Sequence, residues 1–201
     1  MKSKTSLYFA SFIFLMFLVS ISRGQIEGIS PLWTHEELRN ANTTKEARSY
    51  MHSSERDIIT VLNLARLYPK RFVALELTIT EEDYDYEYKR SLIDHMISME
   101  AIRAVKPNQY MYQLARCWAK ESGELGLTGH DRIQCNDGFL AECCSYGKDS
   151  ALGIVLQLLI DYGVPSLGHR IVCLSNDYTR IGATINSHSV WGYVSVLDFS
   201  F

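Results

Sequence analysis

The hydrophobic pattern changes its period along this chain, and the change limits the folds that the chain can adopt. Apolar residues recur at helical spacing in four segments, most clearly from Met111 to Ala119. The segments 179–185 and 190–199 are instead rich in β-branched and aromatic residues, and the turn-forming residues 186–189 separate them. This second pattern predicts a C-terminal β-hairpin. Helices followed by an antiparallel hairpin indicate the α+β fold class.

Helix-stopping and capping residues set the bounds of the predicted helices. Pro69 stops the first pattern, Gly123 is placed to end the third, and Asp149 is a suitable N-cap for the fourth. We therefore expect helices over residues 53–68, 91–104, 111–123 and 149–163. With 201 residues, 47% of them hydrophobic, and only four prolines, the chain is predicted to form one globular domain. The same composition argues against a disordered, collagen-like or coiled-coil protein.

The N-terminal residues have the pattern of a secretory signal peptide. Lys2 and Lys4 precede an apolar stretch over residues 7–21, and Ser22 and Gly24 supply small residues for a cleavage site. The alternative is a retained membrane anchor, but the stretch is shorter than the roughly 20 residues that span a bilayer. We expect residues 1–24 to be removed and the product to be secreted, either extracellular or periplasmic, with no integral membrane span left after cleavage.

Two further expectations follow for the mature chain. Residues 25–52 are polar and lack a clear period, so we expect an irregular N-terminal arm before a domain over residues 53–201. Removal of residues 1–24 leaves 17 basic and 23 acidic residues. Because phosphate binding needs clustered lysine and arginine side chains, an acidic chain of this kind is not expected to bind nucleic acid.

Five cysteines lie in the mature chain, namely Cys117, Cys135, Cys143, Cys144 and Cys173. An oxidising compartment favours disulfide bonds, although the odd count leaves at least one thiol unpaired. Adjacent cysteines are poor partners for each other, so we expect Cys143 or Cys144 to pair with Cys135 or Cys117. The alternative is a zinc site that combines these thiols with a nearby histidine, but the chain has no Cys-x-x-Cys pair with ligand spacing.

Polar residues follow several of the predicted elements. His130 and His169 each come directly after a glycine just beyond a predicted helix, Glu142 follows His130 by 12 residues, and Asp161 lies near the end of the fourth helix. Each of these residues alone is more often a hydrogen-bonded or solvated side chain than a ligand. Together they are candidates for a shared cleft, because loops beyond helix ends present side chains to such clefts.

The order of these motifs resembles the CAP superfamily (cysteine-rich secretory proteins, antigen 5 and pathogenesis-related 1 proteins), and most closely its bacterial secreted branch. The resemblance covers roughly residues 53–201, and the combined order is more specific than any single piece. The matching pieces are Asn63-Leu64-Ala65-Arg66 with Pro69 and Phe72, Pro107 with Leu114-Ala115 and Ala119, Gly129-His130-Asp131-Arg132, Ala141-Glu142 with Tyr146-Gly147, Asp161-Tyr162-Gly163-Val164-Pro165, Gly168-His169-Arg170, Ile181-Gly182-Ala183 and the strand 194–199.

The resemblance implies a three-layer α-β-α sandwich and a cavity lined by two histidines and two acidic residues. By motif, His130 and His169 match the two histidines, Glu142 matches the first acid, and Asp161 falls near the position of the second. Asp161 is one methylene shorter than the glutamate of the family. Cys143 stands where the family usually has asparagine. Together with Cys144, this difference either changes the local disulfide pairing or leaves a thiol beside the predicted cleft.

The predicted cleft suggests three functions. Two imidazoles and two carboxylates form a site for Zn²⁺ or another divalent cation. The resemblance favours a secreted, non-enzymatic binding module with an extracellular ligand, a lipid or sterol as in some relatives. One alternative is a metal-dependent hydrolase or peptidase that uses Glu142 as general base on a metal-bound water. The other is a structural extracellular domain in which the four polar residues only brace the loops.

Overall fold

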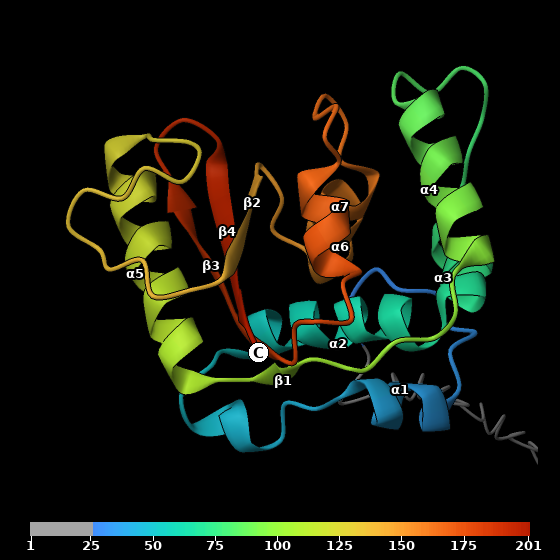
Figure 1. Ribbon diagram of the computed structural model, residues 1–201, viewed down its shortest axis with the longest axis horizontal. Coiled ribbons are helices and arrows are strands. Elements are labelled where there is room, and N and C mark those ends of the chain that lie inside the picture. The colour runs from blue at the N-terminus through green and yellow to red at the C-terminus, as the bar shows by residue number, and fades with distance from the viewer. Residues whose placement is uncertain (1–25) are drawn as a thin grey trace, which may run out of the picture.

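A computed structural model describes residues 26–201 of the chain (Figure 1). The predicted signal peptide lies outside these described residues. Among the helices of the described part, none is both long enough and apolar enough to cross a membrane.

A four-stranded mixed sheet forms the centre of the domain, in the order β1-β3-β4-β2. Its strands are β1 (Lys106–Pro107), β2 (Ala141–Tyr146), β3 (Arg180–His188) and β4 (Gly192–Ser200). Strand β1 runs parallel to β3, whereas β3–β4 and β4–β2 are antiparallel pairs. The predicted C-terminal hairpin is therefore confirmed, while β1 and β2 were not predicted. Strand β2 lies at one edge of the sheet.

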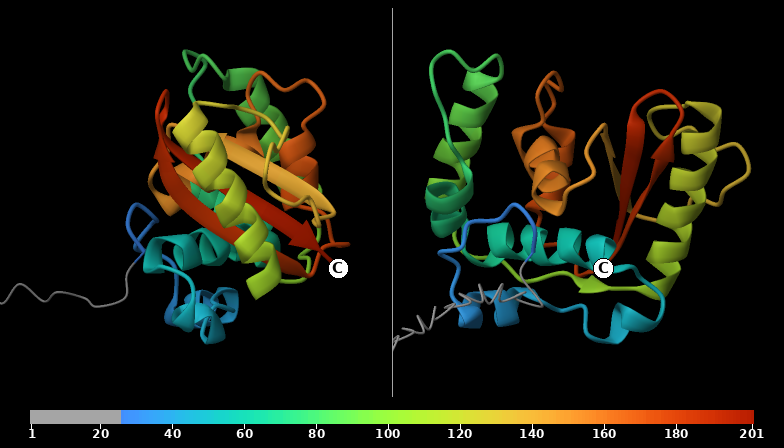
Figure 2. Two further views of the ribbon diagram at one scale, coloured as in Figure 1. Left: turned by 90° about the vertical axis from the view of Figure 1, so that its left-hand side faces the viewer. Right: turned by 180° about the vertical axis from the view of Figure 1, so that it is seen from behind.

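Helices cover both faces of the sheet, so the mixed α and β composition of the prediction is confirmed (Figures 1 and 2). Helix α5 packs against β3 and β4 on one face, whereas α2, α6 and α7 contact β3 and β2 on the other. The helices are α1 (His35–Ala41), α2 (Ser53–Leu67), α3 (Pro69–Glu76), α4 (Tyr86–Ser98), α5 (Gln109–Leu125), α6 (Ala151–Ile160) and α7 (Gly168–Cys173), with a 3₁₀ turn at Glu46–Ser49.

Helix α5 lies unusually close to the sheet because two glycines leave room for its backbone. A Cβ atom at Gly182 on β3 would lie 2.1 Å from the backbone nitrogen of Tyr112, and one at Gly123 would lie 2.1 Å from the carbonyl oxygen of Ser187. The sequence analysis predicted that Gly123 ends the helix, and this prediction is wrong. Gly123 instead permits the close contact with β3. The helix continues to Leu125, and Gly126 ends it in the left-handed conformation with φ of 70°.

Several other element ends differ from the prediction. Helix α4 begins five residues earlier than expected, at Tyr86, and ends at Ser98. Ser150 rather than Asp149 caps α6, since its side chain accepts a hydrogen bond from the Gly153 backbone. Pro69 does end the first helical pattern, but it also begins α3, because proline is well tolerated at the first helical position.

The turn of the hairpin lies later than predicted. Strand β3 continues through residues 186–188, which were expected to form the turn. His188 explains the difference, because its side chain is buried and organises the following residues. Its Nε2 lies 2.9 Å from the Leu127 carbonyl oxygen, and its Nδ1 accepts hydrogen bonds from the Val190 and Trp191 backbones.

Residues 25–52 do not form an irregular arm, which corrects the sequence-based expectation for the part that the structure describes. Helix α1 begins with a capping box, in which Thr34 and Glu37 each accept a hydrogen bond from the backbone of the other. Trp33, Ala41 and Met51 are buried and belong to the main hydrophobic core. Its apolar residues lack a continuous period of their own, because they are spaced to contact residues elsewhere in the chain, as Trp33 contacts Tyr68 and Phe72.

Asn63 ties this segment to the rest of the domain. Its amide nitrogen donates to the carbonyl oxygens of Ala41 (2.9 Å) and Val105 (3.0 Å), and its amide oxygen accepts from the Val105 backbone (2.9 Å). The side chain is fully buried in α2. This network explains why a polar side chain is tolerated at a fully buried position of the helix.

We expect Asn63→Ala to lower the free energy of unfolding by about 2 kcal/mol, because it leaves the buried Val105 backbone nitrogen without its acceptor and removes a donor from the Ala41 and Val105 carbonyl oxygens. Urea unfolding followed by circular dichroism measures this change. Asn136→Ala is a matched control at an exposed position and should change stability by less than about 0.5 kcal/mol. Equal effects of the two substitutions would contradict the structural role of Asn63.

The prediction that Cys143 or Cys144 pairs with Cys135 or Cys117 is wrong. The bond joins Cys117 on α5 to Cys135 in the following loop, while Cys143, Cys144 and Cys173 are free and buried. The physical reason is that Cys117 lies on the exposed side of α5, whereas strand β2 directs Cys143 and Cys144 into the core.

Candidate functional site

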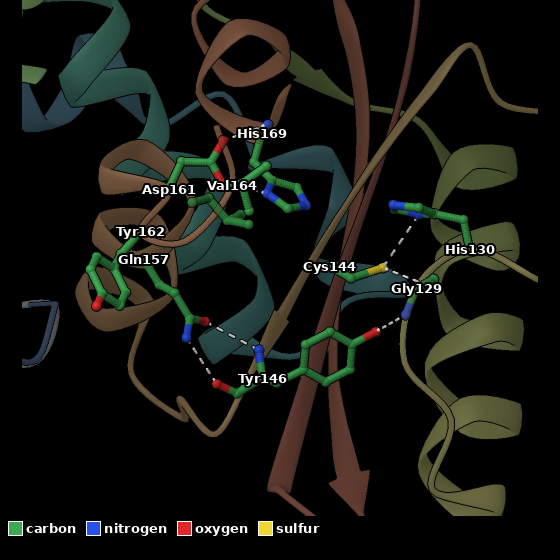
Figure 3. Close-up of a pocket in the computed structure, with 10 residues that line it drawn as sticks. Gly129, His130, Cys144, Tyr146, Gln157, Asp161, Tyr162, Val164 and His169 are labelled. Carbon is green, nitrogen blue, oxygen red and sulfur yellow. Dashed lines mark hydrogen bonds and ion pairs between the residues drawn. The ribbon is translucent and has the colours of Figure 1, made fainter. Parts of the chain in front are cut away.

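The predicted polar residues meet at a pocket beside the outer edge of β2 (Figure 3). The loop after α5 and strand β2 form one wall, and α6 with the segment leading into α7 forms the other. Gln157 of α6 closes part of the strand edge, since its amide accepts from the backbone nitrogen of Tyr146 and donates to its carbonyl oxygen, both at 3.1 Å. The pocket has a volume of about 310 Å³. Its lining residues are Gly129, His130, Cys144, Tyr146, Gln157, Leu158, Asp161, Tyr162, Val164 and His169.

The first wall holds a histidine–carboxylate pair. His130 Nδ1 lies 2.8 Å from Glu142 Oε1, and the histidine side chain is half exposed whereas that of Glu142 is buried. Gly129, with φ of 89°, sets the direction of this loop. Its backbone nitrogen donates to the Tyr146 hydroxyl at 3.0 Å, and its carbonyl oxygen accepts from Trp118 Nε1 at 3.1 Å. These bonds fix the backbone immediately before His130.

Behind His130 lies a buried charge network that sequence reasoning did not predict. Glu142 on β2 and Asp198 on β4 are direct cross-strand neighbours. Arg132 donates through Nη2 to Glu142 Oε2 and to Asp198 Oδ2, the latter at 3.0 Å. Its guanidinium also lies 4.5 Å from the centre of the Phe139 ring. One guanidinium therefore bridges two buried carboxyl groups, which would repel each other if both were ionised.

The two carboxylates of this network differ in their affinity for a proton. Burial opposes ionisation of Glu142, but hydrogen bonds from His130, Asp198 and Arg132 outweigh it and lower its pKa. Burial, reinforced by the neighbouring Glu142 charge, raises the pKa of Asp198 to about 8. Any proton in this network is therefore held mainly on Asp198, and Glu142 stays ionised beside His130.

The second wall holds a similar pair. His169 Nδ1 lies 2.7 Å from Asp161 Oδ1, while Asp161 Oδ2 accepts from the His169 backbone nitrogen at 2.9 Å. Asp161 ends α6 in the left-handed conformation with φ of 58°, an uncommon state for a residue other than glycine. Its carboxylate thus joins the end of α6 to the start of α7. His169 was expected in a loop, but it occupies the first turn of this short helix.

The two histidines face each other across the pocket. Their ring centroids are 6.5 Å apart, with 44° between the ring planes. In each ring Nδ1 is bonded to a carboxylate, so Nε2 is the nitrogen left for a ligand. Figure 3 shows both rings directed into the space between the walls. Carboxylate bonding of this kind orients a histidine and increases its basicity toward a metal.

A third donor, Cys144, completes a group that could hold a metal ion. Its Sγ lies 3.9 Å from His130 Nδ1, and the ligand atoms of His130, Glu142 and Cys144 all lie within 4.8 Å of one another. Burial raises the pKa of the Cys144 thiol well above its usual value. A metal that binds Cys144 must therefore displace a firmly held proton.

The four residues predicted as ligands occupy this region in two pairs. His130, Asp161 and His169 line the pocket, whereas Glu142 lies behind His130. The sequence analysis did not select Arg132 or Asp198 for the site, and it named Cys144 only among the thiols of the alternative zinc site. Asp198 carried a usable signal, because it is an acidic residue within the apolar strand segment 194–199. Arg132 appeared only as part of the motif that contains His130.

The His130–Glu142 pair predicts a pH-dependent contribution to stability. The hydrogen bond to Glu142 raises the folded-state pKa of His130. A histidine whose pKa is higher in the folded state stabilises the fold most below the unfolded pKa of about 6.5. This stabilisation is lost as the pH rises through the folded-state pKa. We therefore expect the difference in free energy of unfolding between the wild type and His130→Gln to become smaller as the pH rises from about 6.5 through the folded-state pKa. Urea titrations at successive pH values measure it, and a difference that grows with pH would contradict the pairing.

Comparisons with known proteins gave no match in a scan of protein-family models, among curated proteins or among solved structures.

Proposed function

We propose that this chain is a secreted CAP-type binding protein whose pocket holds a divalent cation, most favourably Zn²⁺, between His130 and His169. The observation that carries the proposal is the facing pair of imidazoles, each bonded through Nδ1 to a carboxylate at 2.7–2.8 Å. Zinc accepts neutral imidazole readily, and its catalytic and exchangeable sites keep open positions for water or a ligand.

In this proposal the carboxylates of Asp161 and Glu142 orient the two histidine rings and do not bind the metal ion themselves. Asp161 reaches the His169 ring despite being shorter than the glutamate of the family, so the shorter side chain suits this role. Glu142 stays ionised beside His130, which keeps the tautomer with the proton on Nδ1. Cys144 is available as a further, softer ligand on the same wall.

The binding role is favoured over hydrolysis by the state of Glu142. Both of its oxygens are engaged, one by His130 and one by Arg132, and its lowered pKa makes it a weak base. Secretion is supported by the leader pattern of residues 1–24 together with the Cys117–Cys135 disulfide. The helices on both faces of a mixed sheet are compatible with the CAP architecture. Its extracellular ligand, in this proposal, is a lipid or sterol.

Calorimetric titration of the metal-stripped protein with Zn²⁺ tests the proposal. We expect one zinc per chain, with an affinity at least about 100-fold weaker in the His130→Ala/His169→Ala double variant. The matched control is His35→Ala/His95→Ala, which removes two exposed histidines elsewhere and should leave the affinity unchanged.

Two results would overturn the metal assignment. Zinc binding that is equal in the wild type and the double variant would place any bound metal elsewhere on the chain. Absence of binding to the wild type, combined with a lower melting temperature of the double variant, would identify the pocket residues as a structural network.

A further inference from the structure

Three buried cysteines remain outside the Cys117–Cys135 disulfide, and two of them, Cys143 and Cys173, lie on elements that pack against each other. Cys143 lies on β2, and Cys173 is the last residue of α7. Both side chains are essentially inaccessible to solvent, with 0% and 1% exposure. Because successive residues of a strand point to opposite faces, Cys143 faces α7 whereas its neighbour Cys144 faces α5 and the pocket.

The geometry of α7 brings Cys173 toward Cys143. Cys143 Sγ lies 3.8 Å from the carbonyl oxygen of His169, on the side of α7 that packs against β2. Cys173 follows His169 by four residues, about one helical turn, and is buried in the same core. Burial and the neighbouring Cys173 thiol both raise the pKa of Cys143.

We propose that Cys143 and Cys173 form a second disulfide bond, which joins β2 to α7. The apposition of two buried thiols from different elements carries this inference. It also accounts for the odd number of cysteines, since two disulfides leave Cys144 as the single thiol. That thiol is the one beside His130 in the pocket.

The oxidation needs an acceptor, and a small disulfide such as oxidised glutathione supplies it. One protein thiolate attacks a glutathione sulfur, so that the glutathione disulfide breaks and a mixed disulfide forms. The second protein thiolate then attacks the mixed disulfide, forms the Cys143–Cys173 bond and releases the second glutathione. Two protein thiols lose two protons and two electrons, and one glutathione disulfide becomes two thiols. Because both cysteines are buried in the native state, the exchange belongs to folding.

The bond would connect the two walls of the pocket from beneath. On β2, Cys143 directly precedes Cys144, and on α7 Cys173 lies one turn after His169. The crosslink would therefore hold these two pocket residues at a fixed separation. This consequence for the pocket rests on the proposed function, whereas the bond itself does not.

A thiol count tests the bond directly. The protein is reduced, refolded in a glutathione redox buffer with EDTA, then unfolded and alkylated with iodoacetamide for intact-mass measurement. We expect one alkylated cysteine, together with a crosslinked peptide that joins residue 143 to residue 173. The Cys144→Ser variant should give no alkylation and keep the crosslink, which distinguishes Cys143 from its neighbour. Three alkylated cysteines, or a bond from Cys144 to Cys173, would overturn the proposal. Because no metal is present, this outcome is independent of zinc binding.

Thermal unfolding provides a second test that does not depend on peptide mapping. Cys143→Ala and Cys173→Ala should each lower the melting temperature of the oxidised protein by about 5–10 °C, since each removes the same crosslink. The double variant should lose little more than either single variant. Fully additive losses in the oxidised protein would instead indicate two independently packed thiols and would overturn the bond.

Discussion

Replacing Arg132 with leucine is expected to lower the free energy of unfolding by about 3–5 kcal/mol at neutral pH, the range for breaking a buried ion pair by removing one partner. The arginine side chain is 3% exposed, and its guanidinium bonds both Glu142 and Asp198, whose side chains are 1% and 0% exposed. Its removal leaves the buried Glu142 carboxylate without its cation. Unlike a surface ion pair, this network has little water to solvate the uncompensated charge.

Urea unfolding at several pH values measures the Arg132→Leu effect. The destabilisation should decrease in acid, because protonation of Glu142 removes the buried charge that has lost its partner. Adding Glu142→Gln should restore part of the lost stability at neutral pH for the same reason. Arg116→Leu, an exposed substitution on α5, is the matched control and should have an effect below about 0.5 kcal/mol. Similar effects of both arginine substitutions would contradict the buried network.

Replacing Arg170 with methionine is expected to cost about 3–5 kcal/mol through a different mechanism. The buried guanidinium donates to the carbonyl oxygens of Leu159 (2.6 Å), Ile160 (2.8 Å) and Tyr88 (3.0 Å), and to the Ser91 hydroxyl (2.9 Å). Arg170 therefore provides hydrogen-bond donors for carbonyl oxygens at the carboxyl end of α6, and it links this end of α6 to α4. Methionine fills a similar volume but leaves the buried carbonyl oxygens of Leu159 and Ile160 without these donors.

The Arg170→Met prediction is checked by guanidinium chloride unfolding, with Arg90→Met on the exposed side of α4 as the control. Arg170→Lys should recover only part of the loss, because one ammonium group cannot reproduce the planar fork that reaches four acceptors. Full recovery of stability in Arg170→Lys would show that the positive charge at this position, and not the geometry of the guanidinium group, provides the stabilisation. Since Arg170 directly follows His169, the same substitutions also probe the support of the second pocket wall.

Local signals were sufficient for the elements that carry their own pattern. The hairpin over residues 179–199 combines β-branched and aromatic residues with a turn, and the structure confirms it. Helix α5 has an apolar face at regular spacing, and its core was predicted even though its end was not. Both patterns are local, because the residues on the buried face of a helix or strand recur along the chain at the period of that element.

The short strands were not predictable in this way. Strand β1 has two residues and exists because its backbone pairs with Arg180 and Ile181 of β3. Strand β2 contains glutamate, two cysteines and serine, and both of its faces are covered, by α5 on one side and by α6 and α7 on the other. Coverage of both faces removes the alternation of apolar and polar residues that identifies a half-buried strand.

For the candidate site, the motifs of the chain were enough to select His130, Glu142, Asp161 and His169. How these residues pair depends on the tertiary fold. The β2–β4 register placed Glu142 beside Asp198, and the loop after α5 brought Arg132 and His130 to that carboxylate. The Asp161–His169 pair depends on the left-handed end of α6 and the start of α7. Sequence spacing cannot specify such contacts, because they arise from strand register and loop direction rather than from a local period.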